Sequence, residues 1–245
     1  MDSPLSHFSR NQTWLHQKLK NHYLDEVGGT EEAIVSLNGR KYRIDVLDKE
    51  KTTIYEIHRS NFGGKFSEKV KDLLSLSKLK IVIVHPIVLK QKVTRFIRDS
   101  NTVRVSYYNK RGDIFTLFEK LVFFKVKFIP NRMRFDILFI EEHVLKESEG
   151  FWRRSKRRKY KIMQRDLLSV QEIRKFSTRN DFINVLPEKL PDIFTNHDLA
   201  ERLEIQGGIR RVRRIPGCIT YSLCKLGILN RVGTRGRAHE FTIRA

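Results

Sequence analysis

The most constraining feature of this chain is a nearly uninterrupted apolar run, LKIVIVHPIVL, at positions 79–89. A membrane span needs roughly 18–20 apolar residues, so this run is too short to be one. A strand with one solvated face alternates apolar and polar residues, whereas a strand covered on both faces stays apolar. The run therefore predicts a strand buried on both faces, with His85 and Pro86 inside it.

The segments before this run predict the elements that surround it. Apolar residues at helical spacing predict a helix over 11–27, which ends at Gly28-Gly29. Asn38-Gly39 separates two β-rich runs and predicts a hairpin. A third strand is expected over 52–58 and a second helix over 66–76. Because that helix joins the third strand to the buried strand, we expect those two strands to be parallel.

Composition divides the chain into three predicted parts: two domains, each with its own apolar pattern and expected to fold on its own, and a basic segment between them. Residues 1–146 are predicted to form an α/β domain, which gains strands at 101–108, 123–129 and 133–140 and a short helix at 114–121. Seven of the nine residues from 153 to 161 are Lys or Arg, which predicts a basic linker or arm with a helical segment over 147–186. Residues 187–245 form the third part. We expect a solvated strand end, and no second metal site, at Asp136, Glu141 and Glu142.

The order of elements in residues 187–245 is helix, turn, helix and two strands. Thr195 is suited to cap the first helix. The basic run IRRVRRI is followed by Pro216-Gly217 and by CITYSLCKLGIL, in which Ile219, Leu223 and Leu226 share a helical face. This order, with the phrase LCKLGILNRVG, resembles a winged helix domain. The resemblance implies that an arginine-rich helix and the turn between the two strands contact a DNA groove and its phosphates. The implied contacts are Arg210, Arg213 and Arg214 on one arc of the helix, with Arg211 pointing elsewhere, and Arg235 and Arg237 in the turn.

The net charge favours a polyanionic partner. Forty-nine Lys and Arg against 28 Asp and Glu leave +21, and basic residues that neutralise phosphates release condensed counterions. Charge alone leaves structured RNA and anionic membranes as alternatives, but no apolar segment is long enough to enter a membrane. Together with this charge, the resemblance to a winged helix domain implies double-stranded DNA as the partner, contacted also by Arg153, Arg154, Arg157 and Arg158 of the basic segment.

Cysteine content and the N-terminus indicate the compartment. Cys218 and Cys224 make neither a disulfide framework nor a zinc site. The first twelve residues contain no apolar core of a signal peptide. We expect an intracellular, cytoplasmic protein, with no membrane association and no small-molecule cofactor.

Two carboxylates in the predicted hairpin and third strand are candidates for a metal site. A turn that pairs Leu47 with Thr52 would put Asp45 opposite Ile54 and diagonal to Glu56, within about 7–8 Å on the same face. Two carboxylates at that spacing can hold a hard divalent cation. The inference depends on the turn, because a one-residue change in register would put the two side chains on opposite faces.

These elements resemble the core of the PD-(D/E)xK nucleases, the restriction-endonuclease-like fold. The matching segments are RIDVL, YEIH, FSEKVKDLL and KIVIVHPI, within residues 10–90. The resemblance implies a mixed sheet flanked by helices, in which Asp45 and Glu56 bind magnesium or manganese. It also implies an assisting acidic residue near the first helix, for which Glu32 is preferred over Glu31 and Glu26.

The chain departs from the pattern of this family at His58, which stands where the family has lysine. The family can supply the lysine from the following helix, where Lys65 and Lys69 are available, and we include Lys69 with Asp45, Glu56 and His58 as the expected catalytic set. A histidine could itself orient water, act as a base near neutral pH or bind a transition metal. It could equally mark a domain that has lost catalysis.

The leading hypothesis is a metal-dependent DNA endonuclease of restriction or repair type, with a C-terminal winged helix. Nucleases of this fold that cut both strands often act as dimers, which implies a homodimer. The alternative is a catalytically inactive nuclease-fold protein that binds DNA as a regulator. A third hypothesis is an RNA-associated factor.

Overall fold

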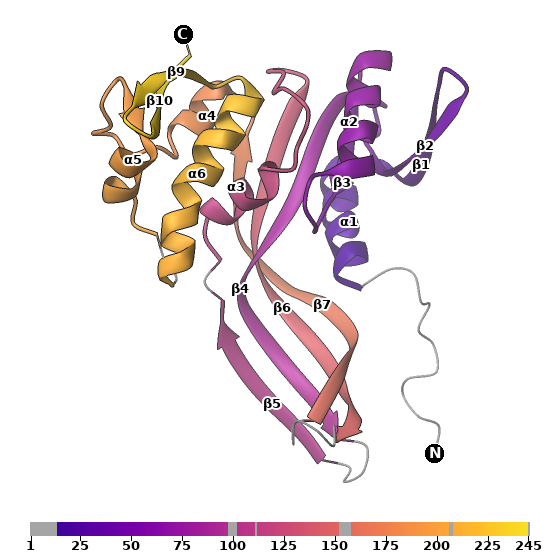
Figure 1. The fold of residues 1–245 in the computed structure, drawn as a ribbon. Helices are drawn as coiled ribbons and strands as arrows, with labels where there is room; N and C mark the ends of the chain where they lie inside the picture. The colour runs from indigo at the N-terminus through magenta and orange to yellow at the C-terminus, as the bar shows by residue number, and fades with distance from the viewer. Residues whose placement is uncertain (1–13, 98–101, 111, 152–157, 206–207, 245) are drawn as a thin grey trace.

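Two lobes lie side by side at one end of the molecule, and an arm of long strands extends from between them (Figure 1). The computed structural model describes residues 14–97, 102–110, 112–151, 158–205 and 208–244. The first lobe contains the segments α1 (Trp14–Val27), β1 (Thr30–Leu37), β2 (Arg40–Leu47), β3 (Thr53–Ile57) and α2 (Gly64–Leu76). The long strands are β4 (Lys80–Ile97), β5 (Thr102–Asn109), β6 (Met133–Phe151) and β7 (Arg158–Phe176).

A mixed seven-stranded sheet forms the centre of the fold. Its order is β1-β2-β3-β4-β6-β7, and β5 pairs with β4. Strand β4 is parallel to both β3 and β6, while the other pairs are antiparallel. The predicted α/β class and the parallel pairing of the third and fourth strands are therefore confirmed. The sheet is flanked by helices, as expected.

The hairpin between β1 and β2 follows from its two turn residues. Leu37 pairs with Arg40 across a two-residue turn. Asn38 and Gly39 have φ values of 47° and 75°, which are the left-handed values that a type I′ turn requires. The sequence prediction of this hairpin is confirmed.

The core lies on both faces of the sheet. Helix α1 covers one face, where its Leu15, Leu19 and Tyr23 belong to one buried cluster with residues of β4 and β6. The other face is covered by α2, by α3 (Phe115–Leu121) and by α6 (Ile209–Leu226), and their apolar residues share a second cluster. Because α6 belongs to the second lobe, this second cluster joins the two lobes into one core.

The second lobe combines two short helices and one long helix with a small sheet. Its helices are α4 (Arg179–Ile183), α5 (Asn196–Arg202) and α6, and its strands are β8 (Phe194–Thr195), β9 (Leu229–Arg235) and β10 (Ala238–Ile243) in the order β8-β10-β9. Thr195 caps α5 with Asp198 in a capping box, as predicted. Helix α6 continues through Pro216. Ile215, Ile219 and Leu223 of α6 are fully buried, and this packing offsets the backbone hydrogen bond that proline cannot donate.

The middle of the chain differs most from the expectation. Residues 158–176, expected in a linker with a helical segment, form β7, which pairs with β6 along nearly its whole length. Strand β6 also continues to Phe151, past the expected boundary at 146. The backbone N–H and C=O groups of β7 form hydrogen bonds with β6. The basic composition of this segment, taken alone, predicts a linker.

Two further local expectations are wrong. Residues 123–129 form no strand, although their apolar alternation is real: Phe124, Val126 and Phe128 point into the core, and the Phe128 N–H donates to Leu226 O at 3.1 Å. Asp136 and Glu142 are buried, with exposures of 0% and 1%, because β6 lies inside the sheet between β4 and β7. Asp136 accepts hydrogen bonds from the Arg134 guanidinium and the Tyr23 hydroxyl.

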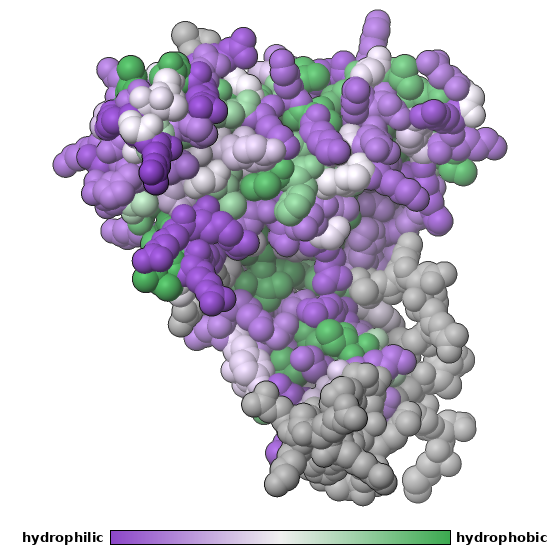
Figure 2. All heavy atoms as spheres, viewed as in Figure 1, coloured by the Kyte–Doolittle hydropathy of each residue, from purple (hydrophilic) through white to green (hydrophobic). Residues whose placement is uncertain are grey.

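Figure 2 shows hydrophilic side chains over most of the visible face, interrupted by apolar patches, including one on the arm. Among the helices of the described residues, none is both long enough and apolar enough to cross a membrane.

Candidate functional site

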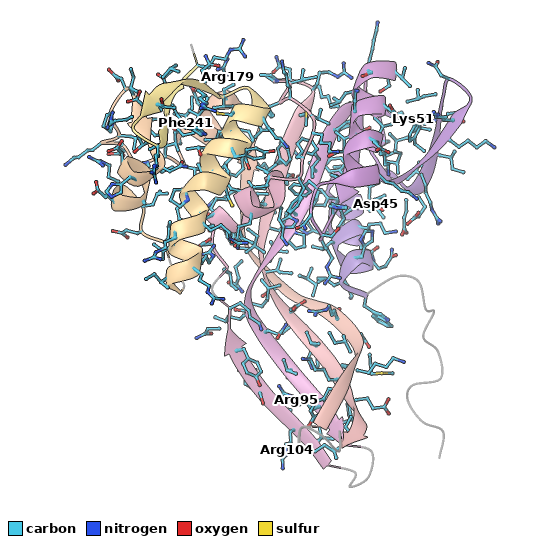
Figure 3. The ribbon with its side chains drawn as sticks, viewed as in Figure 1. Asp45, Lys51, Arg95, Arg104, Arg179 and Phe241 are labelled. Carbon is cyan, nitrogen blue, oxygen red and sulfur yellow. The ribbon has the colours of Figure 1, made fainter. Side chains whose placement is uncertain are left out.

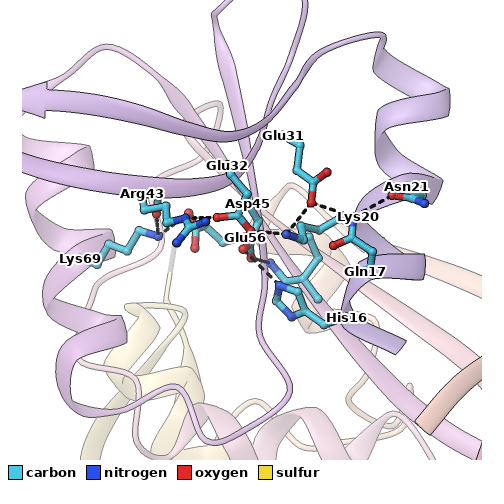
Figure 4. A network of polar contacts seen from close by, with 11 residues as sticks. His16, Gln17, Lys20, Asn21, Glu31, Glu32, Arg43, Asp45, Glu56 and Lys69 are labelled. Atoms are coloured by element: carbon cyan, nitrogen blue, oxygen red, sulfur yellow. Dashed lines mark hydrogen bonds and ion pairs between the residues drawn. The ribbon is translucent and has the colours of Figure 1, made fainter. Parts of the chain in front are cut away.

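The site forms where β2 and β3 stop pairing. Their ladder consists of Val46–Tyr55 and Leu47–Ile54. Leu47 thus pairs with Ile54 rather than with Thr52, and the register places Asp45 opposite Glu56 instead of diagonal to it. The observed register differs from the predicted one by two residues. A shift of two residues leaves each side chain on the same face of the sheet, so Asp45 and Glu56 still lie on one face. Figure 4 shows the two carboxylates next to one another.

Asp45 is held from both sides. Its Oδ1 lies 3.2 Å from His16 Nε2 of α1, and its Oδ2 accepts the backbone N–H of Ile57 at 2.8 Å. Burial alone would raise the pKa of this carboxyl. The hydrogen bonds and the charge of His16 outweigh burial and place the pKa of Asp45 below its usual value.

Glu56 is the most deeply buried acid of the site, with 5% exposure. Burial, opposed by the charge of Lys69 and reinforced by that of Asp45, raises the pKa of Glu56 to about 7. Lys69 Nζ lies 2.6 Å from Glu56 Oε1 and also donates to Arg43 O at 2.5 Å. The Lys69 ammonium is therefore the cation that contacts Oε1 of Glu56 inside the protein.

Lys69 comes from the second turn of α2, four residues after Lys65. The sequence offered both lysines as replacements for the missing one on β3, and the structure brings Lys69 to the carboxylates. Lys65 is exposed. Residues four apart share one face of a helix, so burial rather than face distinguishes the two lysines: the Lys69 side chain is 23% exposed and contacts Glu56.

His58 is directed to the loop that follows β3. Its ring stacks on Phe66 with 3.9 Å between ring centroids, and its Nε2 lies 3.0 Å from both Ser60 Oγ and Asn61 O. Burial lowers the pKa of this imidazole. Among the described contacts the ring makes none to Asp45 or Glu56, so Lys69 occupies the place that the sequence prediction gave to His58.

Glu32 belongs to a neighbouring cluster of charges. Lys20, fully buried on α1, pairs with Glu31 at 2.8 Å and with Glu32. Glu32 also pairs with Arg43. Although burial opposes them, these cations lower the pKa of Glu32, so its carboxylate is already neutralised. Within the described ranges, no group of three His, Cys, Asp or Glu side chains is arranged to hold a metal ion.

Sequence reasoning missed two residues of this site, His16 and Lys20. They lie four residues apart and therefore on one face of α1. That spacing was the available signal, but a buried lysine at such a position is unusual without a partner. Its partners, Glu31 and Glu32, become visible only when β1 is placed beside α1.

The arginines predicted to contact DNA are placed unevenly on α6. Arg210 and Arg213 are exposed, and the described residues offer neither of them an ion pair. Arg211 points elsewhere, as predicted, and donates two hydrogen bonds to Asp113 at 2.7 and 2.5 Å. Arg214 pairs with Glu119 of α3, so its charge is partly neutralised within the protein.

The remaining predicted contacts lie in the β9–β10 turn and in the basic segment. Arg235 pairs with Glu240 at 3.1 Å and with Asp198 at 3.5 Å, while Arg237 is exposed. Arg158 is the first residue of β7. Arg153, Arg154 and Arg157 lie outside the described residues.

Comparison with known proteins places the sheet domain in a family. The chain is similar to an uncharacterized protein of Treponema pallidum (strain Nichols), with 27% identity over 190 residues that cover 78% of this chain and 72% of the relative. No solved structure matches it. A family model described as "Domain of unknown function (DUF8091)" matches residues 13–177, the span from α1 to the end of β7. The chain therefore belongs to this family of unknown function.

Proposed function

We propose that the chain is a metal-dependent endonuclease that hydrolyses phosphodiester bonds in duplex DNA, of the restriction-endonuclease-like type. The observation that carries this proposal is the convergence of Asp45, Glu56 and Lys69 where β2 and β3 stop pairing (Figure 4). Two acidic groups and one lysine are what hydrolysis of a phosphate diester by this chemistry needs: ligands for a cation and a positive group near the attacking water.

The donor set fits a hard divalent cation. Asp45 and Glu56 lie opposite one another in the register of β2 and β3 and supply carboxylate oxygens. Magnesium is commonly held by one or two carboxylates, with waters and substrate phosphates as the other ligands. When bound, such an ion supplies an acidified water and stabilises negative charge on the phosphate.

The protein's own side chains have separate tasks in this proposal. His16 and the Ile57 N–H hold Asp45 in its ionised form. Lys69 is placed to orient a water or to stabilise charge on the phosphate from the α2 side. Glu32 remains tied to Lys20 and Arg43, and this second ion-pair cluster keeps α1 and β1 in position beside the carboxylates.

The second lobe supports DNA as the substrate. Helices α5 and α6 with the β9–β10 hairpin have the order of a winged helix, and Arg210 and Arg213 lie exposed near the start of α6. Exposed arginines on such a helix can contact phosphates or base edges. We therefore assign to this lobe the task of holding the duplex. Cleavage of both strands would need two active sites, which fits a homodimer.

The test is nicking of supercoiled plasmid with magnesium or manganese. Asp45→Asn keeps an oxygen that can accept the Ile57 N–H but removes the charge, so we expect at least a hundredfold loss of nicking with an unchanged fold. Glu50→Gln, an exposed carboxylate in the β2–β3 turn, is the matched control and should nick at the wild-type rate. Equal nicking by wild type and Asp45→Asn, or none with either metal, would refute the proposal.

A second candidate is a non-catalytic DNA-binding regulator. It is favoured by one observation: Asp45 and Glu56 already pair with His16 and Lys69 inside the protein. Paired carboxylates of this kind can be purely structural. This candidate predicts salt-sensitive duplex binding that neither EDTA nor Asp45→Asn changes, with no strand breaks under any metal.

A further inference from the structure

The arm has two faces of different character. We define the arm as residues 90–97, 102–109, 141–151 and 158–167, which form a four-stranded sheet in the order β5-β4-β6-β7. Partners in register point to the same face of a sheet. The register pairs Arg95 with Arg104 and with Lys146, so these three cations lie in a row across three adjacent strands. We call this side the arginine face; Figure 3 shows Arg95 and Arg104 on it.

Arg95 is held in a fixed orientation on the arginine face. Its guanidinium donates to Ser106 Oγ at 3.1 Å and to the Tyr108 hydroxyl at 2.7 Å. It also lies over the rings of Tyr108 and Tyr160, at 5.6 and 5.8 Å from their centroids. An arginine stacked between aromatic rings is pre-organised, so it loses little side-chain entropy when it binds an oxyanion.

Three cations of the arginine face have no carboxylate among the described residues to neutralise them: Arg95, Arg104 and Lys146. Arg165 on the same face, by contrast, pairs with Glu142. Glu142 points to this face but is buried and engaged by Gln91 and Arg165. In the described part of the chain, no ion pair is formed by Arg95, Arg104 or Lys146. Neighbouring strands lie about 5 Å apart, so the row of three cations across three strands is about 10 Å long.

The opposite face carries three acidic residues of the arm. The register puts Glu141, Glu147 and Asp166 there, and Lys90 is paired with Glu141 at 2.9 Å. Over residues 90–110 and 141–167 the chain has fifteen Lys and Arg and six Asp and Glu. The excess of positive charge is therefore concentrated on the arginine face and on the basic segment that joins β6 to β7.

We propose that the arginine face binds the phosphate backbone of duplex DNA. The inference rests on the proposed function, which already places a duplex at the two lobes, and it adds the arm as a separate contact. A flat sheet with rigid guanidinium and ammonium groups suits phosphates at fixed spacing. Binding to an anionic membrane is strengthened by an apolar face beside the cations, whereas three of the four exposed apolar residues of β5, Val103, Val105 and Tyr107, lie on the opposite face, and the fourth, Tyr108, contacts Arg95.

The test compares two double variants that remove equal charge from opposite faces of the arm. Arg104→Gln with Lys146→Gln changes the arginine face, and Lys92→Gln with Lys161→Gln changes the other face. Binding to a fluorescent duplex is measured in EDTA, so that cleavage plays no part, at several salt concentrations. We expect the first pair to lower affinity about tenfold and to reduce the slope of log affinity against log salt by about two. The second pair should change affinity less than twofold.

Three results would overturn the inference. Equal losses in both double variants would indicate a general charge effect, and no loss in either would show that the arm does not contact the duplex. Binding to phosphatidylserine vesicles that is lost with the arginine face, while duplex binding is kept, would assign the face to membranes. Asp45→Asn separates this inference from the proposed function: loss of nicking with full duplex binding supports both, and absence of nicking in wild type with a face-specific loss of binding leaves the arm contact standing alone.

Discussion

At the scale of single residues, the two lysines of α2 give the sharpest test of the site. Lys69 contacts Glu56 and Arg43, whereas Lys65 is exposed one turn away. We expect Lys69→Met to reduce plasmid nicking about a hundredfold, because it removes the positive group beside the carboxylates. Lys65→Met carries the same change in charge and should leave the rate unchanged. Similar rates for the two variants would exclude a specific role for Lys69.

His85 gives a residue-scale prediction for stability against pH. It is 2% exposed in β4, its Nδ1 lies 2.6 Å from His58 O, and burial lowers its pKa to about 4. The unfolded chain, with a pKa near 6.5, binds the proton first as pH falls. The contribution of the neutral imidazole is therefore complete above pH 6.5 and is lost as pH falls through 4, by about 2–3 kcal/mol in total.

This prediction is checked by urea unfolding between pH 7.5 and 4. The free energy of unfolding of wild type should fall more steeply with acid than that of His85→Asn, because only the wild type gains a proton at this position on unfolding. Parallel curves for the two proteins would mean that His85 is not held neutral by the fold.

At the scale of elements, the turn between α1 and β1 depends on close backbone contact. A Cβ added at Gly29 would lie 1.9 Å from Leu47 O, which the backbone of β2 cannot relieve without moving. At Gly39 a Cβ would meet nothing, but φ there is +75°. We expect Gly39→Ala to cost about 1 kcal/mol from backbone strain and Gly29→Ala at least about 2 kcal/mol from the clash. Denaturant unfolding measures both, and a smaller loss for Gly29→Ala would contradict the packing seen here.

Elements that are determined by interactions between residues close in sequence could be predicted, whereas elements that depend on pairing between distant strands could not. Asn38-Gly39 and the Thr195 capping box act over two to four residues, so the sequence predicts the hairpin and the start of α5. The crossover from β3 to β4 also follows from chain order. The length of β7 does not, because its pairing with β6 is decided by the ladder and not by its own basic residues.

In the candidate site, too, the residues related by local strand geometry could be predicted, and those brought in by long-range packing could not. Asp45 and Glu56 could be predicted as neighbours because a strand has a period of two. The exact register could not, since it depends on Lys51, which adopts φ 56° in the turn. His16 and Lys20 join the site only through the packing of α1 against the sheet, for which the helix itself carries little signal.

At the scale of the whole molecule, the two lobes share one core. Ile215, Ile219 and Leu223 of α6 belong to the same buried cluster as Val70 of α2 and Phe118 of α3. Hydrogen bonds reinforce the junction: Ser222 Oγ donates to Phe118 O at 3.2 Å, and the Phe128 N–H donates to Leu226 O. Removing the residues after 146 would cut β6 and uncover this core, so the shared core argues against independent folding of residues 1–146, which stays a prediction to be tested.

Because the two lobes share one core, we expect a destabilising substitution in the second lobe to destabilise the first lobe as well. Leu223 is fully buried in α6, and Leu223→Ala should cost about 2–5 kcal/mol through lost burial and the cavity it leaves. Tyr221 of the same helix is 48% exposed, so Tyr221→Ala is a control with a small cost. Hydrogen exchange read separately in β3 and in β10 measures the two lobes. If they form one cooperative unit, Leu223→Ala lowers protection equally in both strands. Loss of protection in β10 with full protection in β3 would show that the lobes unfold independently in spite of their common core.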